Sequence, residues 1–183
     1  MSILTERRSV RQFTNADISD EQLKYILRAA MYAPSAMNRQ PWQYYVTKRG
    51  DKLTQLAELW NTAFLPKPTN AEEEAFIKSR HVILQQAAAV VLVCGDSEKE
   101  LTESWATVDC GAATQNLLLA THELGLGGVW IGVWPRLDRA KLLADFFKLP
   151  PHHKAFALCA LGVPAVTPVQ PAERYDASKV HFV

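Results

Sequence analysis

The chain has 183 residues, of which 48% are hydrophobic and 21% are charged, as expected of a single globular domain. Its 20 basic and 19 acidic residues give a net charge of +1. This balance argues against a nucleic-acid or membrane-surface protein, because such proteins usually carry a clear basic excess. No apolar run reaches the roughly 18 residues of a membrane span, and the first ten residues lack the apolar segment of a signal peptide. We therefore expect one cytoplasmic domain.

The three cysteines, Cys94, Cys110 and Cys159, are far apart in the sequence, and each lies in an apolar segment. An odd number with this spacing does not indicate a disulfide framework. We expect them to be small buried hydrophobic residues in a reducing compartment.

Helices and strands are predicted in alternation. Ser19 and Gln22 form a capping box that begins a helix, and the helix ends near Ala33 because Pro34 disfavours helix in the residue before it. The further elements expected are strands at 43–47, 87–94, 127–133 and 154–161, and helices at 52–60, 72–78, 102–124 and 138–147. The unbroken apolar run at 87–94 is typical of a strand covered on both faces. This order favours an α/β or α+β layer fold in which helices cover a mixed sheet.

The chain ends in a proline-rich tail of about 20 residues that begins after Gly162. A tail of this length without regular structure is unusual on a compact monomer. We expect it to wrap around a partner subunit, with residues 179–183 adding a strand to the partner's sheet.

The first candidate site is basic and lies near the amino terminus. Arg7, Arg8 and Arg11, together with Ser9, place three guanidinium groups and a hydroxyl within five residues. Arginine binds phosphate oxygens through two parallel hydrogen bonds and stays charged at any relevant pH, so the segment could bind an anion. A solvated basic terminus is the alternative. A nucleic-acid arm is a third possibility, but no second basic stripe supports it.

Two further segments could contact a ligand. The loop between Pro34 and Pro41 holds short polar side chains that could bind the polar edge of a ligand, although an ordinary turn also fits. The glycines of residues 125–132 would let backbone N–H groups approach a flat ligand closely. This is no dinucleotide fingerprint, because the segment follows a helix and enters a strand. A helix cap and tight turn would explain Gly125 but not Gly132.

The remaining polar groups give weaker signals. His152 and His153 have no third ligand nearby in the sequence, and no His or Cys spacing typical of zinc occurs, so no metal site is expected. Asp109 fits a paired structural acid better than a catalytic base. The aromatic residues Trp60, Phe64 and Phe76 could form a mobile lid or simply part of the local core.

Taken together, the candidate segments resemble the FMN-dependent nitroreductase family over nearly the whole chain. The residues that carry the resemblance are 7–11, 33–42, Asp109 with Gly111, Gln115 with Asn116, 124–132, 161–164 and Arg174. The resemblance implies one nitroreductase-like α+β domain over residues 1–183. It also implies a homodimer with two FMN sites at the subunit interface and an exchanged C-terminal arm at about 165–183.

The resemblance assigns most of these residues to the cofactor. Arg7, Arg8 and Ser9 would bind the FMN phosphate and ribityl chain, with Arg174 as a further phosphate ligand. Arg11 would lie at the pyrimidine side of the ring, where its charge favours the anionic reduced form. The loop of the other subunit and the backbone of one strand would line the ring, namely Pro34, Ser35, Ala36, Met37, Asn38, Gln40, Trp130, Ile131, Gly132 and Val133. Which of the last four residues meets the hydride-accepting nitrogen stays open.

The implied reaction passes a hydride from NADH or NADPH through FMN to a small acceptor such as a nitroaromatic or quinone. No catalytic side chain is expected, because the flavin carries the redox chemistry. Trp60 and Phe64 would line the acceptor cleft. The alternative is a non-redox flavin-binding or flavin-handling protein on the same scaffold.

Overall fold

The computed structural model of the protein describes residues 2–169 and 172–183. In chain order its elements are α1 (Ser2–Glu6), α2 (Asp20–Met31), the 3-10 turn η1 (Ala36–Asn38), β1 (Trp42–Lys48), α3 (Asp51–Phe64), α4 (Ala71–Gln86), β2 (Ala89–Asp96), α5 (Glu103–Glu123), β3 (Gly127–Gly132), α6 (Leu137–Phe147), β4 (His153–Gly162) and η2 (Ala177–Lys179). Every helix and strand expected from the sequence is present. The capping box of α2 is confirmed, since Ser19 Oγ accepts from the Gln22 amide and Gln22 Oε1 accepts from the Ser19 amide.

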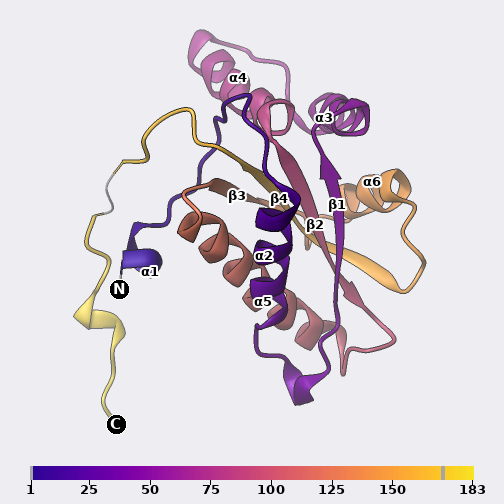
Figure 1. Cartoon of the computed structure of the whole chain (residues 1–183), viewed down its shortest axis with the longest axis vertical. Coiled ribbons are helices and arrows are strands. Elements are labelled where there is room, and N and C mark those ends of the chain that lie inside the picture. Colours follow the sequence, from indigo (N-terminus) through magenta and orange to yellow (C-terminus); the bar gives the residue numbers. More distant parts are fainter. Residues whose placement is uncertain (1, 170–171) are drawn as a thin grey trace.

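The four strands form one sheet in the order β1-β2-β4-β3, and each neighbouring pair is antiparallel (Figure 1). The α+β class is confirmed, but the expectation of a mixed sheet is wrong for these strands. Two helices, α3 and α4, separate β1 from β2, so the chain returns to the end of the sheet that it left and β2 runs back beside β1. Among the described residues, the parallel contact is the isolated bridge between Ser9 and Gly128.

Helices cover both faces of the sheet (Figure 1). One hydrophobic core lies between the sheet and α2 with α5, and the other lies between the sheet and α3, α4 and α6. Along β2 the side chains alternate between these cores: Val90 and Leu92 belong to one, Val91 and Val93 to the other. This alternation explains why an unbroken apolar run was the correct signal for a strand covered on both faces.

The sequence underestimated α4 and did not predict α1. The expected charged helix at 72–78 is the first half of a 16-residue helix. Ile83 and Leu84 in its second half are buried in the core, so packing extends the helix beyond its charged turns. The three cysteines are free and buried, as expected, and burial raises the pKa of the Cys159 thiol to about 12.

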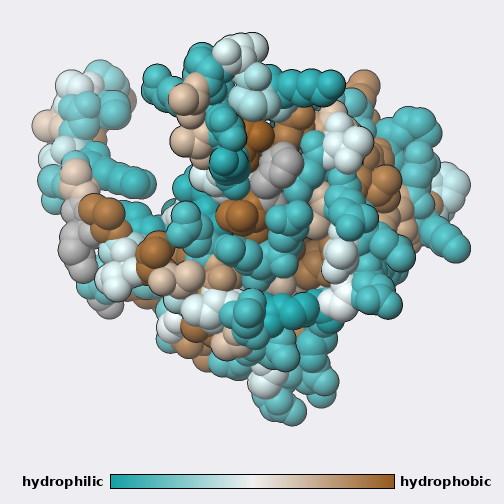
Figure 2. Space-filling view, turned by 90° about the horizontal axis from the view of Figure 1, so that it is seen from above, coloured by the Kyte–Doolittle hydropathy of each residue, from teal (hydrophilic) through white to brown (hydrophobic). Residues whose placement is uncertain are grey.

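The tail leaves the body after a short attachment. The Ala165 amide donates to the Gln12 carbonyl at 3.0 Å, and Phe13 bridges to Pro164. Beyond this point the tail runs along one side of the molecule (Figure 1), and Figure 2 shows it separated from the body by an open gap. Its Tyr175 and Phe182 are 73% and 96% exposed. None of the described helices is both long and apolar enough to cross a bilayer.

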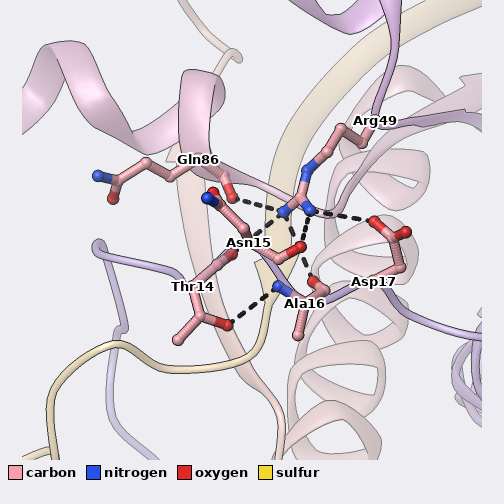
Figure 3. A network of polar contacts seen from close by, with 6 residues as sticks. All are labelled: Thr14, Asn15, Ala16, Asp17, Arg49 and Gln86. Carbon is pink, nitrogen blue, oxygen red and sulfur yellow. Dashed lines mark hydrogen bonds and ion pairs between the residues drawn. The ribbon is translucent and has the colours of Figure 1, made fainter.

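The segment that follows the arginine-rich residues is fastened to the core by Arg49, at the end of β1 (Figure 3). Its guanidinium donates to the carbonyl of Thr14 at 3.1 Å and to the carbonyl of Asn15, and it pairs with Asp17 at 3.0 Å. It also reaches the Gln86 carbonyl at the end of α4, 3.3 Å away. One side chain therefore joins the N-terminal segment, β1 and α4.

Replacing Arg49 should destabilise the fold through these contacts. We expect Arg49→Met to lower the free energy of unfolding by about 2–3 kcal/mol, because several carbonyls lose a charged donor. Chemical denaturation measures this value. The control is Arg28→Met, which removes an exposed arginine of α2 and should change stability by no more than about 0.5 kcal/mol. Equal stabilities for the two variants would contradict the role given to Arg49.

Candidate functional site

Two hollows lie along β3, next to each other. Gly128, near the start of the strand, lines a hollow of about 140 Å³ together with Arg7 and Arg8. Residues 129–132 line a larger cavity of about 330 Å³. Because a strand rises about 3.3 Å per residue, one elongated ligand could span both hollows.

One edge of β3 faces these hollows, since β3 is the last strand of the sheet. The Gly128 carbonyl accepts from the Val10 amide at 3.0 Å, and the Gly132 carbonyl accepts from Arg139 Nη1 at 2.7 Å. Neither partner belongs to β4, so Gly128 and Gly132 direct their backbone groups away from the sheet. Backbone groups of alternate residues point the same way along a strand. The amides of Trp130 and Gly132 therefore point outward from the sheet, and that of Ile131 points toward β4.

The smaller hollow is strongly basic. Arg7 and Arg8 are half-buried, and Arg7 Nε and Arg8 Nη2 are buried without a hydrogen-bond partner in the described part of the chain. Burial lowers the pKa of Arg7, and the charges of Arg8 and Arg174 lower it further. Arg174 comes from the tail, 167 positions along the chain from Arg7. Unpaired donors and like charges this close favour an anion between them.

The larger cavity is lined by several residues that are far apart in the sequence. Arg11, Trp60 and Phe64 line it together with the 129–132 part of β3. Trp60 is only 6% exposed and packs edge to face against Phe64, with ring centroids 4.7 Å apart. Trp60 is therefore a fixed wall and part of the core, which disfavours the lid hypothesis for this residue. Val133 is fully buried in the core and does not line the cavity.

The glycines of the 125–132 segment have different roles. Gly125 has a φ of +72° at the end of α5, as a helix cap requires. A Cβ on Gly127 would lie 2.7 Å from Val10 Cβ, so this glycine lets the N-terminal segment lie against β3. A Cβ on Gly132 would meet no atom within 4 Å. Gly132 thus leaves open space beside the cavity. This explains the one of the two glycines, Gly125 and Gly132, that a helix cap and tight turn did not.

The polar loop lies at the other end of the molecule. The Ala36 amide donates to Asp109 Oδ1 at 3.0 Å, so buried Asp109 acts as a structural acid that fastens the loop to α5. Met37, Asn38 and Gln40 all have positive φ values, near +50°, and Met37 is 82% exposed. Such backbone strain outside glycine often marks a binding segment. The smaller hollow reaches α5 at Leu118 and His122, which lie 9 and 13 residues, or about 14 and 20 Å, along the helix from Asp109.

Within one chain, therefore, the loop does not join the two hollows. The residues that meet along β3 are Arg7, Arg8, Arg11, Trp60, Phe64, Trp130, Ile131 and Gly132. The loop residues line neither hollow and are fastened to the first half of α5 instead, namely Pro34, Ser35, Ala36, Met37, Asn38 and Gln40.

His152 and His153 do have a third potential ligand nearby in space, contrary to the sequence interpretation. Asp96, at the end of β2, offers an oxygen within 4.8 Å of both imidazoles. The sequence could not show this, because the contact depends on the pairing of β2 with β4. The Asp96 carboxylate already accepts from the Glu98 amide at 3.1 Å and from Gln43 Nε2 at 3.3 Å, and Lys99 lies 3.7 Å away. These contacts explain why the carboxylate is buried: it stabilises the turn after β2 and binds the Gln43 side chain of the neighbouring strand β1.

Two arginines of the larger cavity were missed by the sequence analysis. Arg139 of α6 lies over the Trp60 and Phe64 rings, and Arg80 of α4 lies over Phe76. Arg80 follows Phe76 by four residues on one helix face, a spacing that allows contact, but nothing in the sequence places this face at the cavity. Arg139 reaches it only because α6 packs beside α3.

A basic hollow beside an aromatic cavity at the edge of an α+β sheet defines a candidate binding site for a flat, phosphorylated ligand. Comparison with known proteins places this fold in a family. The profile of the nitroreductase family matches residues 4–163. The chain therefore belongs to the nitroreductase family of oxidoreductases.

Individual relatives agree with this assignment. A protein of Archaeoglobus fulgidus with the provisional name NADH dehydrogenase/NAD(P)H nitroreductase is 35% identical over 166 residues, covering 90% of this chain and 84% of its own. The NADH dehydrogenase of Thermus thermophilus is 30% identical over 182 residues, covering 87% and 84%. The crystal structure of a nitroreductase with bound FMN from Desulfitobacterium hafniense superposes with a TM-score of 0.77 at 28% identity, covering 100% of this chain and 96% of that one.

Two glycines of β3, Gly127 and Gly132, provide a matched test of the site's construction. We expect Gly127→Ala to lower the free energy of unfolding by about 1–3 kcal/mol, because its methyl group would collide with Val10. Gly132→Ala should leave stability within about 0.5 kcal/mol of the parent, since it points into open space. Thermal and chemical denaturation compare the two variants. A Gly132→Ala protein as unstable as Gly127→Ala would contradict this assignment of roles.

Proposed function

We propose that this protein is an FMN-dependent NAD(P)H oxidoreductase that acts as a homodimer on small electron acceptors such as quinones or nitroaromatics. The observation that carries the proposal is the pair of neighbouring hollows along β3. One has unpaired arginines suited to a phosphate, and the other has aromatic walls suited to a flat ring. FMN has a phosphate at one end and a flat ring system at the other. Solved nitroreductases of similar fold contain it.

The residues present fit this cofactor. Arg7 and Arg8 have buried donors without partners, and the charge of Arg174 adds to theirs. A phosphate dianion here would satisfy those donors and remove the repulsion among the three guanidinium groups. Ser9 is exposed on the same segment and lies opposite Gly128, where its hydroxyl could reach the ribityl chain.

The free edge of β3 would orient the ring. Trp130 and Gly132 direct their amides outward, so one of these two, rather than Ile131, would donate to the hydride-accepting nitrogen. When bound, FMN would supply two-electron chemistry, taking a hydride from the nicotinamide and passing it to the acceptor. Arg11 lines the same cavity, and its positive charge would stabilise negative charge that builds up on the ring.

The overall reaction balances without a further reactant. NAD(P)H, a quinone and one proton give NAD(P)⁺ and the hydroquinone. The chain needs no acid or base of its own for the hydride transfers, and its contribution is to position the donor and acceptor on one ring face. This explains why the cavity is lined by aromatic and arginine side chains.

Two features favour a homodimer. The strained loop with Met37 and Asn38 lies at the opposite end of the molecule from the arginine hollow, so it would complete a site only on a second copy of the chain. The tail exposes Tyr175 and Phe182 in a segment that stands off from its own body (Figure 2). Burial of these side chains against a second subunit would remove a large apolar area from water.

Cofactor content and reduction test the function directly. We expect the purified protein to be yellow, to sediment at twice the chain mass, and to lose its colour when NADH or NADPH is added anaerobically. Steady-state oxidation of NAD(P)H should then require a quinone or nitroaromatic. A colourless protein that does not bind added FMN would refute the proposal. A yellow protein without turnover would favour the alternative of a non-redox flavin-binding or flavin-handling protein.

The phosphate assignment has its own test. Arg8→Ala should weaken FMN binding roughly 10- to 150-fold, because a charge-assisted hydrogen bond contributes about 1.5–3 kcal/mol. Quenching of flavin fluorescence on binding measures the dissociation constant, and a thermal melt checks that the variant is folded. The control is Arg28→Ala, on the exposed face of α2, which should bind FMN as the parent does. Unchanged affinity in a folded Arg8→Ala protein would overturn the assignment.

A further inference from the structure

The larger cavity carries an excess of positive charge that FMN binding does not account for. Three arginines line it, namely Arg11, Arg80 and Arg139, and no acidic side chain is among its described lining residues. Arg11 is assigned above to the flavin ring. Arg80 and Arg139 come from α4 and α6 and have no role in the proposed cofactor site.

Arg139 is held in a fixed position. Its Nη1 donates to the Gly132 carbonyl at 2.7 Å, and its guanidinium carbon lies 5.2 Å from the Trp60 ring centroid and 5.5 Å from that of Phe64. Both contacts are within the range of cation–π attraction. Its Nε is buried without a partner among the described residues. The cation therefore stands at the junction of the β3 edge and the aromatic wall.

Arg80 lines the same cavity from α4. Its guanidinium carbon lies 4.8 Å from the centroid of the Phe76 ring. Burial lowers the pKa of Arg11, and the nearby charge of Arg80 lowers it further, so the two cations repel each other. No carboxylate relieves this repulsion, since none of the three cavity arginines forms an ion pair within residues 2–169 and 172–183.

Two other arginines do have carboxylate partners. Arg136, the residue just before α6, pairs with Asp138 at 2.6 Å, and Arg49 pairs with Asp17 at 3.0 Å. What distinguishes the cavity is that three unpaired guanidinium groups line one space together with aromatic rings. A half-enclosed cavity with like charges and aromatic walls would favour a ligand that combines a flat ring with a negative charge.

We propose that the cavity selects aromatic or quinone acceptors that carry an anionic group such as a carboxylate or sulfonate, with Arg80 and Arg139 as the residues that determine this specificity. The inference rests on the proposed function, because it names the substrate class of the same site. The ring of the acceptor would lie on the flavin side of the cavity, beside Trp60 and Phe64. Its anionic group would lie against the guanidinium groups, which form no ion pair in the described part of the chain.

The same cations could instead bind a phosphate of the reduced nicotinamide, which is also anionic. The two possible ligands, acceptor and nicotinamide, can be distinguished by the kinetic constant that changes when the arginines are replaced. If they recognise the acceptor, their loss raises the acceptor's KM. If they recognise the nicotinamide, their loss raises the KM for NADH or NADPH and leaves the choice among acceptors unchanged.

The experiment compares 1,4-naphthoquinone-2-sulfonate with 1,4-naphthoquinone as acceptors of the flavin-loaded dimer at saturating NADH or NADPH. We expect the ratio of kcat/KM values, sulfonate over neutral quinone, to fall about tenfold or more in Arg139→Gln and in Arg80→Gln. Arg136→Gln is the matched control, since it removes a charge just before α6 and outside the cavity, and its ratio should stay within twofold of the parent. The intrinsic reactivities of the two quinones cancel when the variants are compared by this ratio.

An unchanged ratio in both cavity variants would overturn the proposal, and so would an effect confined to the KM of the nicotinamide. Turnover of both quinones without anionic selectivity would leave the proposed function intact and reject this inference alone. A direct binding measurement keeps the inference testable even if no turnover occurs. Calorimetry should show 2-naphthoate binding at least tenfold more tightly than the neutral 2-naphthamide, with the difference lost in Arg80→Gln, whereas equal binding of the two probes would reject the inference.

Discussion

The close packing of the N-terminal segment against the sheet is the constraint on which the site depends. Val10 occupies the space that a side chain on Gly127 would fill, and Phe13 does the same at Gly162. The segment cannot lie this close to β3 and β4 unless both positions lack a Cβ. Backbone hydrogen bonds from Val10 to Gly128 and from Thr14 to Val163 then fix its register. Arg49 fastens the end of the segment to β1 and α4 (Figure 3).

This packing explains where the charges are. Arg7, Arg8 and Arg11 belong to a segment whose intervening residue, Val10, is anchored in the core. The anchor directs two cations to the smaller hollow and one to the larger cavity. Cations on a free N-terminus would relax into solvent, but here the fixed backbone keeps them close together and partly desolvated. The repulsion among them is a cost that folding tolerates and that an anionic ligand would offset.

Local signals in the sequence were sufficient to predict the helices and strands, but they did not predict how these elements are arranged in space. The capping box at Ser19, the Pro34 stop and the apolar run of β2 each act within a few residues, so they identified α2 and β2 correctly. The direction of neighbouring strands depends on where the connecting helices pack, and the sequence pattern does not encode this. Two helices join β1 to β2 and one joins β3 to β4, yet both pairs are antiparallel. The full length of α4 was missed for a related reason, since its second half is stabilised by core contacts of Ile83 and Leu84.

The candidate site shows the same difference between local signals, which the sequence reveals, and spatial arrangement, which it does not. Residues gathered in one short segment, such as Arg7 and Arg8, could be recognised from composition alone. The contact of Asp96 with His152 and His153 depends on the pairing of β2 with β4. The convergence of Arg80 and Arg139 depends on the positions of two helices on one face of the sheet. Neither arginine belongs to a motif, because each contributes through its place in the fold.

The geometry of α5 gives the strongest argument that the proposed function requires two chains. The helix is rigid and long, and it separates the loop fastened by Asp109 from the hollow that His122 lines. A single chain holds the two places apart, because about 14 to 20 Å of helix lies between Asp109 and the residues Leu118 and His122 that line the hollow. A second chain related by a twofold axis could place its loop beside the first chain's hollow and accept the first chain's loop in return, which is how symmetric interfaces form. The strain at Met37, Asn38 and Gln40 would then be maintained by Asp109 so that the loop keeps a shape that only the neighbouring site uses.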